Sequence, residues 1–119
     1  MVVKRKNRKA GTQLTEDTAD LVAERFRALA EPMRLRLLNA LRPHARSVGE
    51  LVSLTGTSQA NVSKHLQLLY KQGFVDRRKD GTTIYYRIAD PMVFEMCDLV
   101  CDGIQQDLDA RRARLNPEH

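Results

Sequence analysis

A stretch of hydrogen-bonding and basic side chains without any Asp or Glu lies between Gly56 and Asp76. On a helical wheel, Val62, Leu66 and Leu69 fall within one narrow sector, and the opposite sector is polar. Gln and Asn can each form two hydrogen bonds with adenine, Lys can reach guanine, and Ala can contact a thymine methyl group. We therefore predict a helix that contacts DNA through Ser58, Gln59, Ala60, Asn61, Ser63, Lys64, His65 and Gln67.

The prediction of DNA contact rests on the absence of Asp and Glu from this helix face, and the role of His65 depends on its position at the edge of the apolar sector. Solvated helix faces usually mix Glu with Lys, and this face contains no acid, which favours nucleic acid over plain solvent. His65 lies beside the apolar sector, so its ring either contacts a phosphate or simply packs.

Two thiols, Cys97 and Cys101, are the second feature that could support chemistry. Their spacing places them on one face of a helix, where two thiolates could bind arsenite or a soft divalent metal ion with a ligand from another subunit. They could also sense oxidants or reactive sulfur. The structural alternative is that Cys97, Cys101, Ile104 and Leu108 form an apolar stripe at heptad-like spacing, because buried Cys behaves as a small hydrophobic residue. Both interpretations remain open at this stage.

Other catalytic chemistry has no support in the sequence. There is no Gly-rich phosphate loop, no nucleophile with a partnered His, and no pair of acids in an apolar setting. We expect that the protein is not an enzyme. The three histidines, His44, His65 and His119, form no ligand pair.

The elements that would position these residues begin with four helices. Thr15 is suited to cap the first, and Pro32 opens the second, whose apolar face is formed by Leu37, Leu38 and Leu41. Ser47 and Glu50 have the spacing of a capping box at the start of the third helix. Leu51 and Leu54 should face inward from this helix, and Gly56 should end it. Thr57 or Ser58 then caps the fourth, which ends at Gly73, so two helices follow each other across a turn of about three residues, as in a helix-turn-helix.

A β-hairpin should follow, with strands 74–79 and 82–88 around an Asp80-Gly81 turn. In that register Val75 lies opposite Tyr86, and Arg77 lies opposite Ile84. The hairpin would form a wing that grips the DNA backbone or the minor groove. Its candidate contacts are Arg77, Arg78, Lys79 and Thr82. Asp90 and Pro91 should start a last helix that runs to about Asp109.

The 119 residues fit one domain, and they carry a net charge of +5. Cations gather at both ends, so we expect a flexible basic tail at 1–14, a folded domain at 15–109 and a basic tail at 110–119. Apolar content is 42% and Trp is absent, which makes a dimer with a shared core plausible. No membrane span is evident, and two cysteines suggest a reducing, cytoplasmic compartment.

Several motifs, in the right order, resemble the ArsR family of bacterial repressors. They are the run Phe26 to Leu38, Gly49-Glu50-Leu51, the run Ser58 to Leu66, Leu69, and Gly81 followed by Tyr85-Tyr86; the resemblance spans Ala23 to Gly103. It implies a mainly α winged helix-turn-helix of order α-α-α-α-β-β-α with dimerisation helices at both ends. It also implies a cytoplasmic, nucleoid-associated homodimer that binds double-stranded DNA at a palindromic, inverted-repeat operator until a metal ion or another signal releases it.

The sequence departs from the family at both of its familiar metal sites. The third helix reads Ser47-Val48-Gly49-Glu50-Leu51, with Ser47 where family sensors often carry a Cys. At the last helix Asp90 matches, but Met92, Gly103 and Gln106 occupy the other ligand positions. Any inducer is therefore expected to act at Cys97 and Cys101. The alternative to a repressor is a winged-helix module that binds proteins without operator specificity, and the acid-free helix face argues against it.

Overall fold

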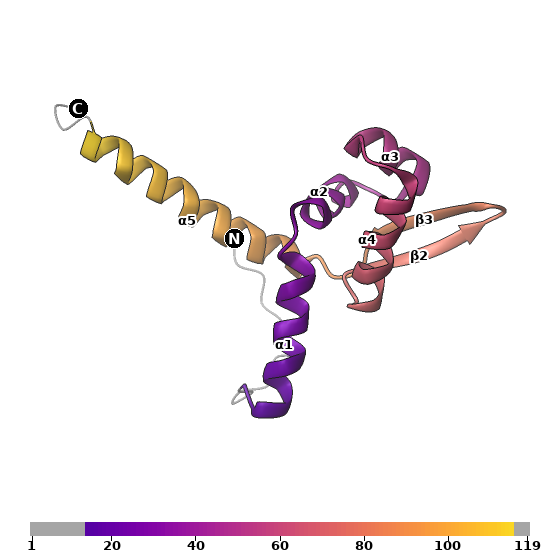
Figure 1. The fold of residues 1–119 in the computed structure, drawn as a ribbon, viewed down its shortest axis with the longest axis horizontal. Coiled ribbons are helices and arrows are strands. Elements are labelled where there is room, and N and C mark those ends of the chain that lie inside the picture. The colour runs from indigo at the N-terminus through magenta and orange to yellow at the C-terminus, as the bar shows by residue number, and fades with distance from the viewer. Residues whose placement is uncertain (1–13, 116–119) are drawn as a thin grey trace.

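Local capping signals define the helices of the computed structural model, which describes residues 14–115 (Figure 1). The Thr15 and Ser47 side chains form capping boxes, Ser58 accepts a hydrogen bond from the backbone of Asn61, and Pro32 opens its helix beside the cap Glu31. The elements are α1 (Glu16–Leu29), α2 (Pro32–Leu41), β1 (Arg46–Ser47), α3 (Val48–Thr55), α4 (Gln59–Lys71), β2 (Val75–Asp80), β3 (Thr83–Ile88) and α5 (Met92–Leu115).

The strands form an antiparallel sheet in the order β1-β3-β2, so the hairpin gains a short third strand that the sequence did not predict. The predicted register is wrong by two residues: Val75 pairs with Ile88, and Arg77 pairs with Tyr86. The turn residues are Gly81 and Thr82 rather than Asp80 and Gly81, because Asp80 pairs with Thr83. Of the two turn residues, Gly81 has a positive φ, 62°, and Thr82 does not. A type II′ turn needs a positive φ only at its first central residue, and Gly supplies it. Both registers keep Val75 and Tyr86 on the same face of the ribbon, and both side chains are buried.

The core lies where α2, α3 and α4 pack against one another and against the sheet. The apolar face predicted for α2 is confirmed, since Leu37, Leu38 and Leu41 are buried. From α3, Leu51 is fully buried, but the prediction for Leu54 is wrong because 57% of it is exposed. Leu54 lies in the last turn of this eight-residue helix, where it lines a surface hollow together with Ala40 and Pro43 instead of entering the core.

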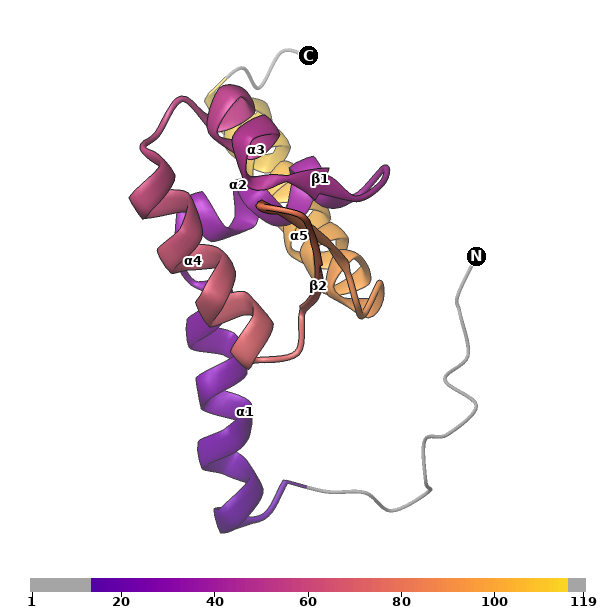
Figure 2. The ribbon, with the colours of Figure 1, turned by 90° about the vertical axis from the view of Figure 1, so that its right-hand side faces the viewer.

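Helices α1 and α5 project away from this core in different directions (Figures 1 and 2). In α5 only Val93 is buried, and Phe94 and Cys97 pack partly against the core. Beyond these first turns, the helix exposes apolar side chains at Leu99, Val100, Ile104, Leu108 and Leu115. On α1, Leu21 and Phe26 are 60% and 57% exposed.

The helix α5 continues to Leu115, past the predicted end at about Asp109. The added residues are mainly Ala, Arg and Leu, which all favour helix, and the next strong helix breaker is Pro117. Of the predicted tails, residues 1–13 and 116–119 lie outside the described part of the chain. None of the described helices has the length and hydropathy that crossing a bilayer requires.

Candidate nucleic-acid interface

Helix α4 is capped at both ends, and three buried apolar side chains fix it against the core. Gly56, in the left-handed conformation with φ 71°, ends α3, and α4 begins after Ser58. The side chains of Val62, Leu66 and Leu69 are fully buried, as predicted for the core face. The opposite face of α4 is therefore turned to solvent.

The exposed face of α4 presents most of the predicted base-contacting side chains. Gln59, Ala60, Lys64 and Gln67 are exposed, and Ser63 is half-buried. Together they offer amide, hydroxyl and ammonium groups with no carboxylate among them. This set can donate to and accept from base edges, and it presents no charge that would repel phosphate.

A hollow of about 330 Å³ lies between the first turns of α4 and the turn of the hairpin. Gln59 and Ser63 line it from α4, and Thr82 and Thr83 line it from the hairpin. The structure thus brings together three residues, Gln59, Ser63 and Thr82, that were assigned to DNA on separate grounds. Their side chains are uncharged hydrogen-bonding groups, suited to a sugar–phosphate strand that passes between helix and wing.

Two cations of the wing, defined as the β2–β3 hairpin, lie over aromatic rings. The Arg77 guanidinium lies 4.1 Å from the centre of the Tyr70 ring, and that of Arg78 lies 5.0 Å from the Tyr85 ring. Arg78 also pairs with Asp80 at 3.7 Å, with both side chains largely exposed. Exposed pairs of this kind contribute little and can yield to a phosphate. Lys79 is exposed as well. The sequence analysis did not predict that Tyr70 of α4 contacts Arg77 of the wing.

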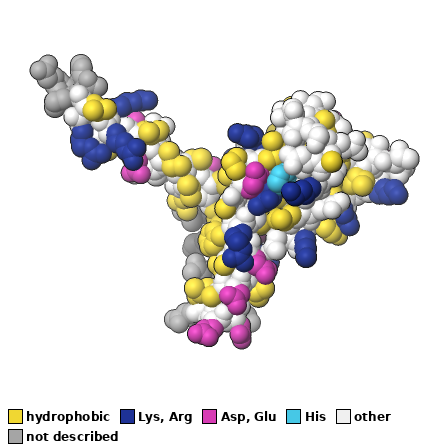
Figure 3. All heavy atoms as spheres, in the orientation of Figure 1, with side chains coloured by type: hydrophobic (Ala, Val, Ile, Leu, Met, Phe, Trp, Pro, Cys, Tyr) yellow, Lys and Arg dark blue, Asp and Glu magenta, His cyan; other side chains and the backbone are white. Residues whose placement is uncertain are grey.

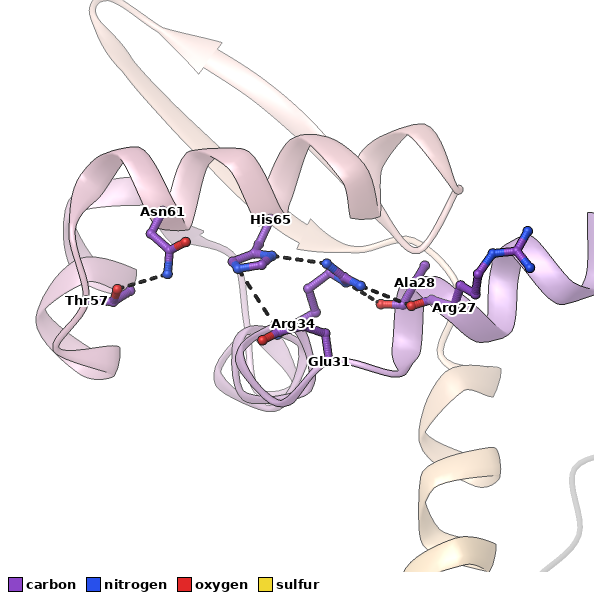
Figure 4. Close-up of polar contacts among 7 residues, drawn as sticks. All are labelled: Arg27, Ala28, Glu31, Arg34, Thr57, Asn61 and His65. Atoms are coloured by element: carbon purple, nitrogen blue, oxygen red, sulfur yellow. Dashed lines mark hydrogen bonds and ion pairs between the residues drawn. The ribbon is translucent and has the colours of Figure 1, made fainter.

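Two of the residues predicted to contact DNA lie on a different side of α4 (Figure 4). His65 is only 8% exposed, and its Nδ1 lies 3.2 Å from Nη1 of Arg34 on α2. The amide of half-buried Asn61 donates to the Thr57 hydroxyl at 3.0 Å, which ties it to the turn before α4. Of the two interpretations that the sequence left open for His65, its burial and its contact with Arg34 favour packing. Its place beside the apolar sector was the sequence signal, and Arg34 on the facing helix was missed.

Charge is distributed unevenly over the surface (Figure 3). In this view acidic side chains gather toward the start of α1, whereas Lys and Arg side chains lie around the hairpin and along the far part of α5. The acids near the start of α1 include Glu16 and Asp17. The hairpin side of the molecule is thus the more favourable for a polyanion.

The two thiols differ in environment. Cys97 is half-buried at the root of α5, and Cys101 is exposed one turn further on. Burial raises the pKa of the Cys97 thiol, and Cys101 and Asp98 act in the same direction. Among the described residues of one protomer, no cluster of three or more His, Cys, Asp or Glu is arranged to hold a metal ion. Within residues 14–115, the two thiols on α5 are therefore not joined by a third such side chain in an arrangement that could hold a soft metal ion.

Residues 29–78 match the family model of a helix-turn-helix domain. Among curated proteins, the chain is 42% identical over 77 residues to a probable mercury resistance operon repressor of Streptomyces lividans. That match covers 65% of this chain and 62% of the Streptomyces protein, so it spans less than two thirds of that relative. It is also 38% identical over 90 residues to the transcriptional repressor SmtB homolog of Synechocystis sp., which covers 76% of this chain and 68% of the relative.

Solved structures show the same arrangement of elements. The solution structure of a homodimeric winged helix-turn-helix DNA-binding domain from Mycobacterium bovis superposes with a TM-score of 0.69 at 35% identity. The match covers 86% of this chain and 95% of that domain. The order of helices and the wing described above are therefore those of a winged helix-turn-helix.

Proposed function

The chain belongs to the ArsR family of winged helix-turn-helix transcriptional repressors, and from this premise we propose that it represses transcription as a homodimer on an inverted-repeat operator. The observation that carries the proposal is the exposed, acid-free face of α4 beside the wing. Lys64 and Gln67 project from this face, and Gln59 joins Thr82 at the hollow between helix and wing. In the proposal α4 enters the major groove, and the wing contacts the adjacent backbone or minor groove.

The site residues follow from this placement. Gln59, Ala60, Lys64 and Gln67 contact base edges in the proposal. The backbone contacts are assigned to Ser58, Ser63, Arg77, Arg78, Lys79 and Thr82. Asn61, held by Thr57, has its amide oxygen left for a contact at the entry to the helix.

Dimerisation is proposed through the exposed apolar faces of α1 and α5. In α5, Leu99, Val100 and Ile104 are 73%, 62% and 55% exposed, an arrangement that a single chain does not bury. Contiguous exposed apolar surface of this kind marks a protein interface. Two copies that pair through these helices present two α4 helices, which matches the symmetry of an inverted repeat.

Release of the operator is proposed to depend on Cys97 and Cys101. Both lie on α5, the helix proposed to pair with its partner, so a ligand or an oxidation at these thiols would alter the dimer. Because residues 14–115 of one protomer hold no cluster of three or more ligand side chains, arsenite or a soft metal ion would draw a further ligand from the second protomer.

The experiment that tests the function is selection of bound fragments from random double-stranded DNA with the full chain. We expect an inverted repeat to be enriched, and the affinity for it to fall steeply with salt because several phosphate contacts release counterions. A flat salt response without preference for any sequence would favour a protein-binding module instead.

A further inference from the structure

Arg34 stands where α1, α2 and α4 meet, and its guanidinium reaches all three helices (Figure 4). Its Nε donates to the carbonyl of Ala28 at 2.6 Å, and its Nη2 donates to that of Arg27 at 3.0 Å, both in the last turn of α1. Its Nη1 lies 3.2 Å from Nδ1 of His65 on α4. One side chain on α2 thus links the end of α1 to the middle of α4.

The chemistry of the pair fixes the state of the imidazole. A guanidinium carries only donors, so Nδ1 of His65 must accept the hydrogen bond from Arg34. The ring proton is then on Nε2, which lies 3.9 Å from a carboxylate oxygen of Glu31. Glu31 is itself held in place, because its carboxylate accepts the backbone N–H of Arg34 at 2.9 Å. Arg34 and Glu31 are the charged groups that face the ring, and both lie where α1 ends and α2 begins.

We propose that Arg34 and His65 are positioning residues for operator recognition, which set the rotation of α4 against the α1–α2 corner. The inference rests on the proposed function. A 100° turn separates successive side chains on a helix, so fixing His65 inward also fixes the direction of Lys64 and Gln67 outward. The contact is directional in a way that the neighbouring Leu66 and Leu69 contacts are not, because a hydrogen bond requires an aligned donor and acceptor.

The contact between Arg34 and His65 also connects α4, the reading helix of the proposed function, to the proposed dimer surface. Arg34 binds carbonyls of α1 one and two residues beyond Phe26, which is 57% exposed on the face proposed to meet the partner. If α1 moves when two protomers pair, the Arg34 side chain transmits that movement to His65. The packing of α4 does not by itself require the polar Arg34–His65 pair, because apolar residues of similar volume often replace buried charged pairs without loss of stability.

The test compares variants of the full chain on the selected operator and on a scrambled duplex of equal length. His65→Leu fills the space but removes the acceptor, and Arg34→Lys keeps the charge but loses the fork that serves three acceptors. His65→Asn retains an oxygen at the position of Nδ1, two bonds from Cβ, and so can still accept from Arg34. Arg36→Lys, at an exposed position on the same helix, is the matched control.

We expect His65→Leu and Arg34→Lys to lower operator affinity about tenfold, the loss of one charge-assisted hydrogen bond. Binding to the scrambled duplex and the melting temperature of His65→Leu should stay near those of the wild type. His65→Asn should recover most of the operator affinity. Nitrogen NMR of the wild type should show His65 with an unprotonated Nδ1 and a protonated Nε2.

Three results would overturn the inference. These are unchanged operator affinity in both His65→Leu and Arg34→Lys, an equal loss on operator and scrambled DNA, or no recovery in a folded His65→Asn. If Arg34→Lys fails to fold, the two His65 variants and the NMR signature decide the matter. A wild type without preference for any duplex would instead contradict the proposed function, and the inference with it.

Discussion

The guanidinium of Arg77 on β2 lies over the ring of Tyr70 on α4, 4.1 Å from its centre. The two residues come from different elements, and their contact joins the base of the wing to the last turn of the reading helix. Tyr70 is 40% exposed, so the stack lies at the surface, where such contacts contribute about 0.5–1 kcal/mol. The direction in which the wing leaves the domain is thus tied to α4 by an aromatic contact.

Loss of this ring should loosen the wing. Tyr70→Leu is expected to weaken operator binding about two- to fivefold, the equivalent of one exposed cation–π contact. Tyr70→Phe keeps the ring face and should bind nearly as the wild type does. Fluorescence anisotropy with a labelled operator measures both. An effect of Tyr70→Phe as large as that of Tyr70→Leu would show that the hydroxyl, and not the stack, matters.

Lys64 and Arg78 should contribute to binding in different ways. Lys64 projects from α4 toward base edges in the proposal, so Lys64→Ala is expected to lower operator affinity more than affinity for random DNA. Arg78 lies on the wing, so Arg78→Ala should weaken both and reduce the slope of log K against log salt by about one. Titrations at several salt concentrations separate the two. Equal losses on both DNAs for Lys64→Ala would place its ammonium on a phosphate.

Much of the fold could be predicted because its signals are local. The Ser47–Glu50 capping box, Gly56 and the Val62-Leu66-Leu69 face each depend on residues within a few positions of one another, and the structure confirms all three. The hairpin turn was missed because Gly81 can occupy either central position of a two-residue turn, and the sequence does not choose between them.

Features that depend on contacts distant in sequence were not predictable in the same way. The strand β1 has two residues and exists because Arg46 and Ser47 pair with Tyr86 and Tyr85. The helical wheel placed His65 at the edge of the core face, and only the position of Arg34 on α2 decides that it packs inward. The exposed, acid-free face of α4 was predictable from the helical wheel, whereas the contact between Arg34 and His65 was not.

The thiols should control DNA binding if the proposed release mechanism holds. Arsenite, Cd²⁺ or a mild oxidant is expected to lower operator affinity of the wild type and to leave a Cys97→Ser/Cys101→Ser variant unaffected. Because burial raises the pKa of Cys97, its thiol stays protonated at neutral pH, and binding of Cd²⁺ should strengthen as pH rises and the proton is released. Operator titrations between pH 7 and 9 measure this. If none of the three agents changes affinity, the cysteines are structural.

Acid should destabilise the domain partly through Glu31. The backbone N–H of Arg34, whose hydrogen bond the Glu31 carboxylate accepts, holds the pKa of Glu31 below the ordinary value of 4.5, and the charge of the Arg34 guanidinium adds to the shift. A lowered folded pKa stabilises the fold above the unfolded value, and this contribution is lost as pH falls through the folded pKa. Glu31→Gln should therefore lower the melting temperature at neutral pH and flatten its fall in acid. Glu24→Gln, in the middle of α1, is the control, and an equal flattening there would contradict the assignment.

Dimerisation should depend on the apolar face of α5. Ile104 is 55% exposed in the single chain, and it lies between Val100 and Leu108 on the face proposed to meet the partner. Ile104→Glu would bury a carboxylate in that contact, which is costly without a partner charge, so we expect sedimentation to report a monomer. Operator affinity should fall with it, because one protomer reaches only one half-site of an inverted repeat. Gln105→Glu introduces the same charge on the side of α5 that carries Asp98, Asp102 and Asp109, and it should leave the dimer intact. A dimer that persists in Ile104→Glu, or that dissociates equally in Gln105→Glu, would move the interface away from this face of α5.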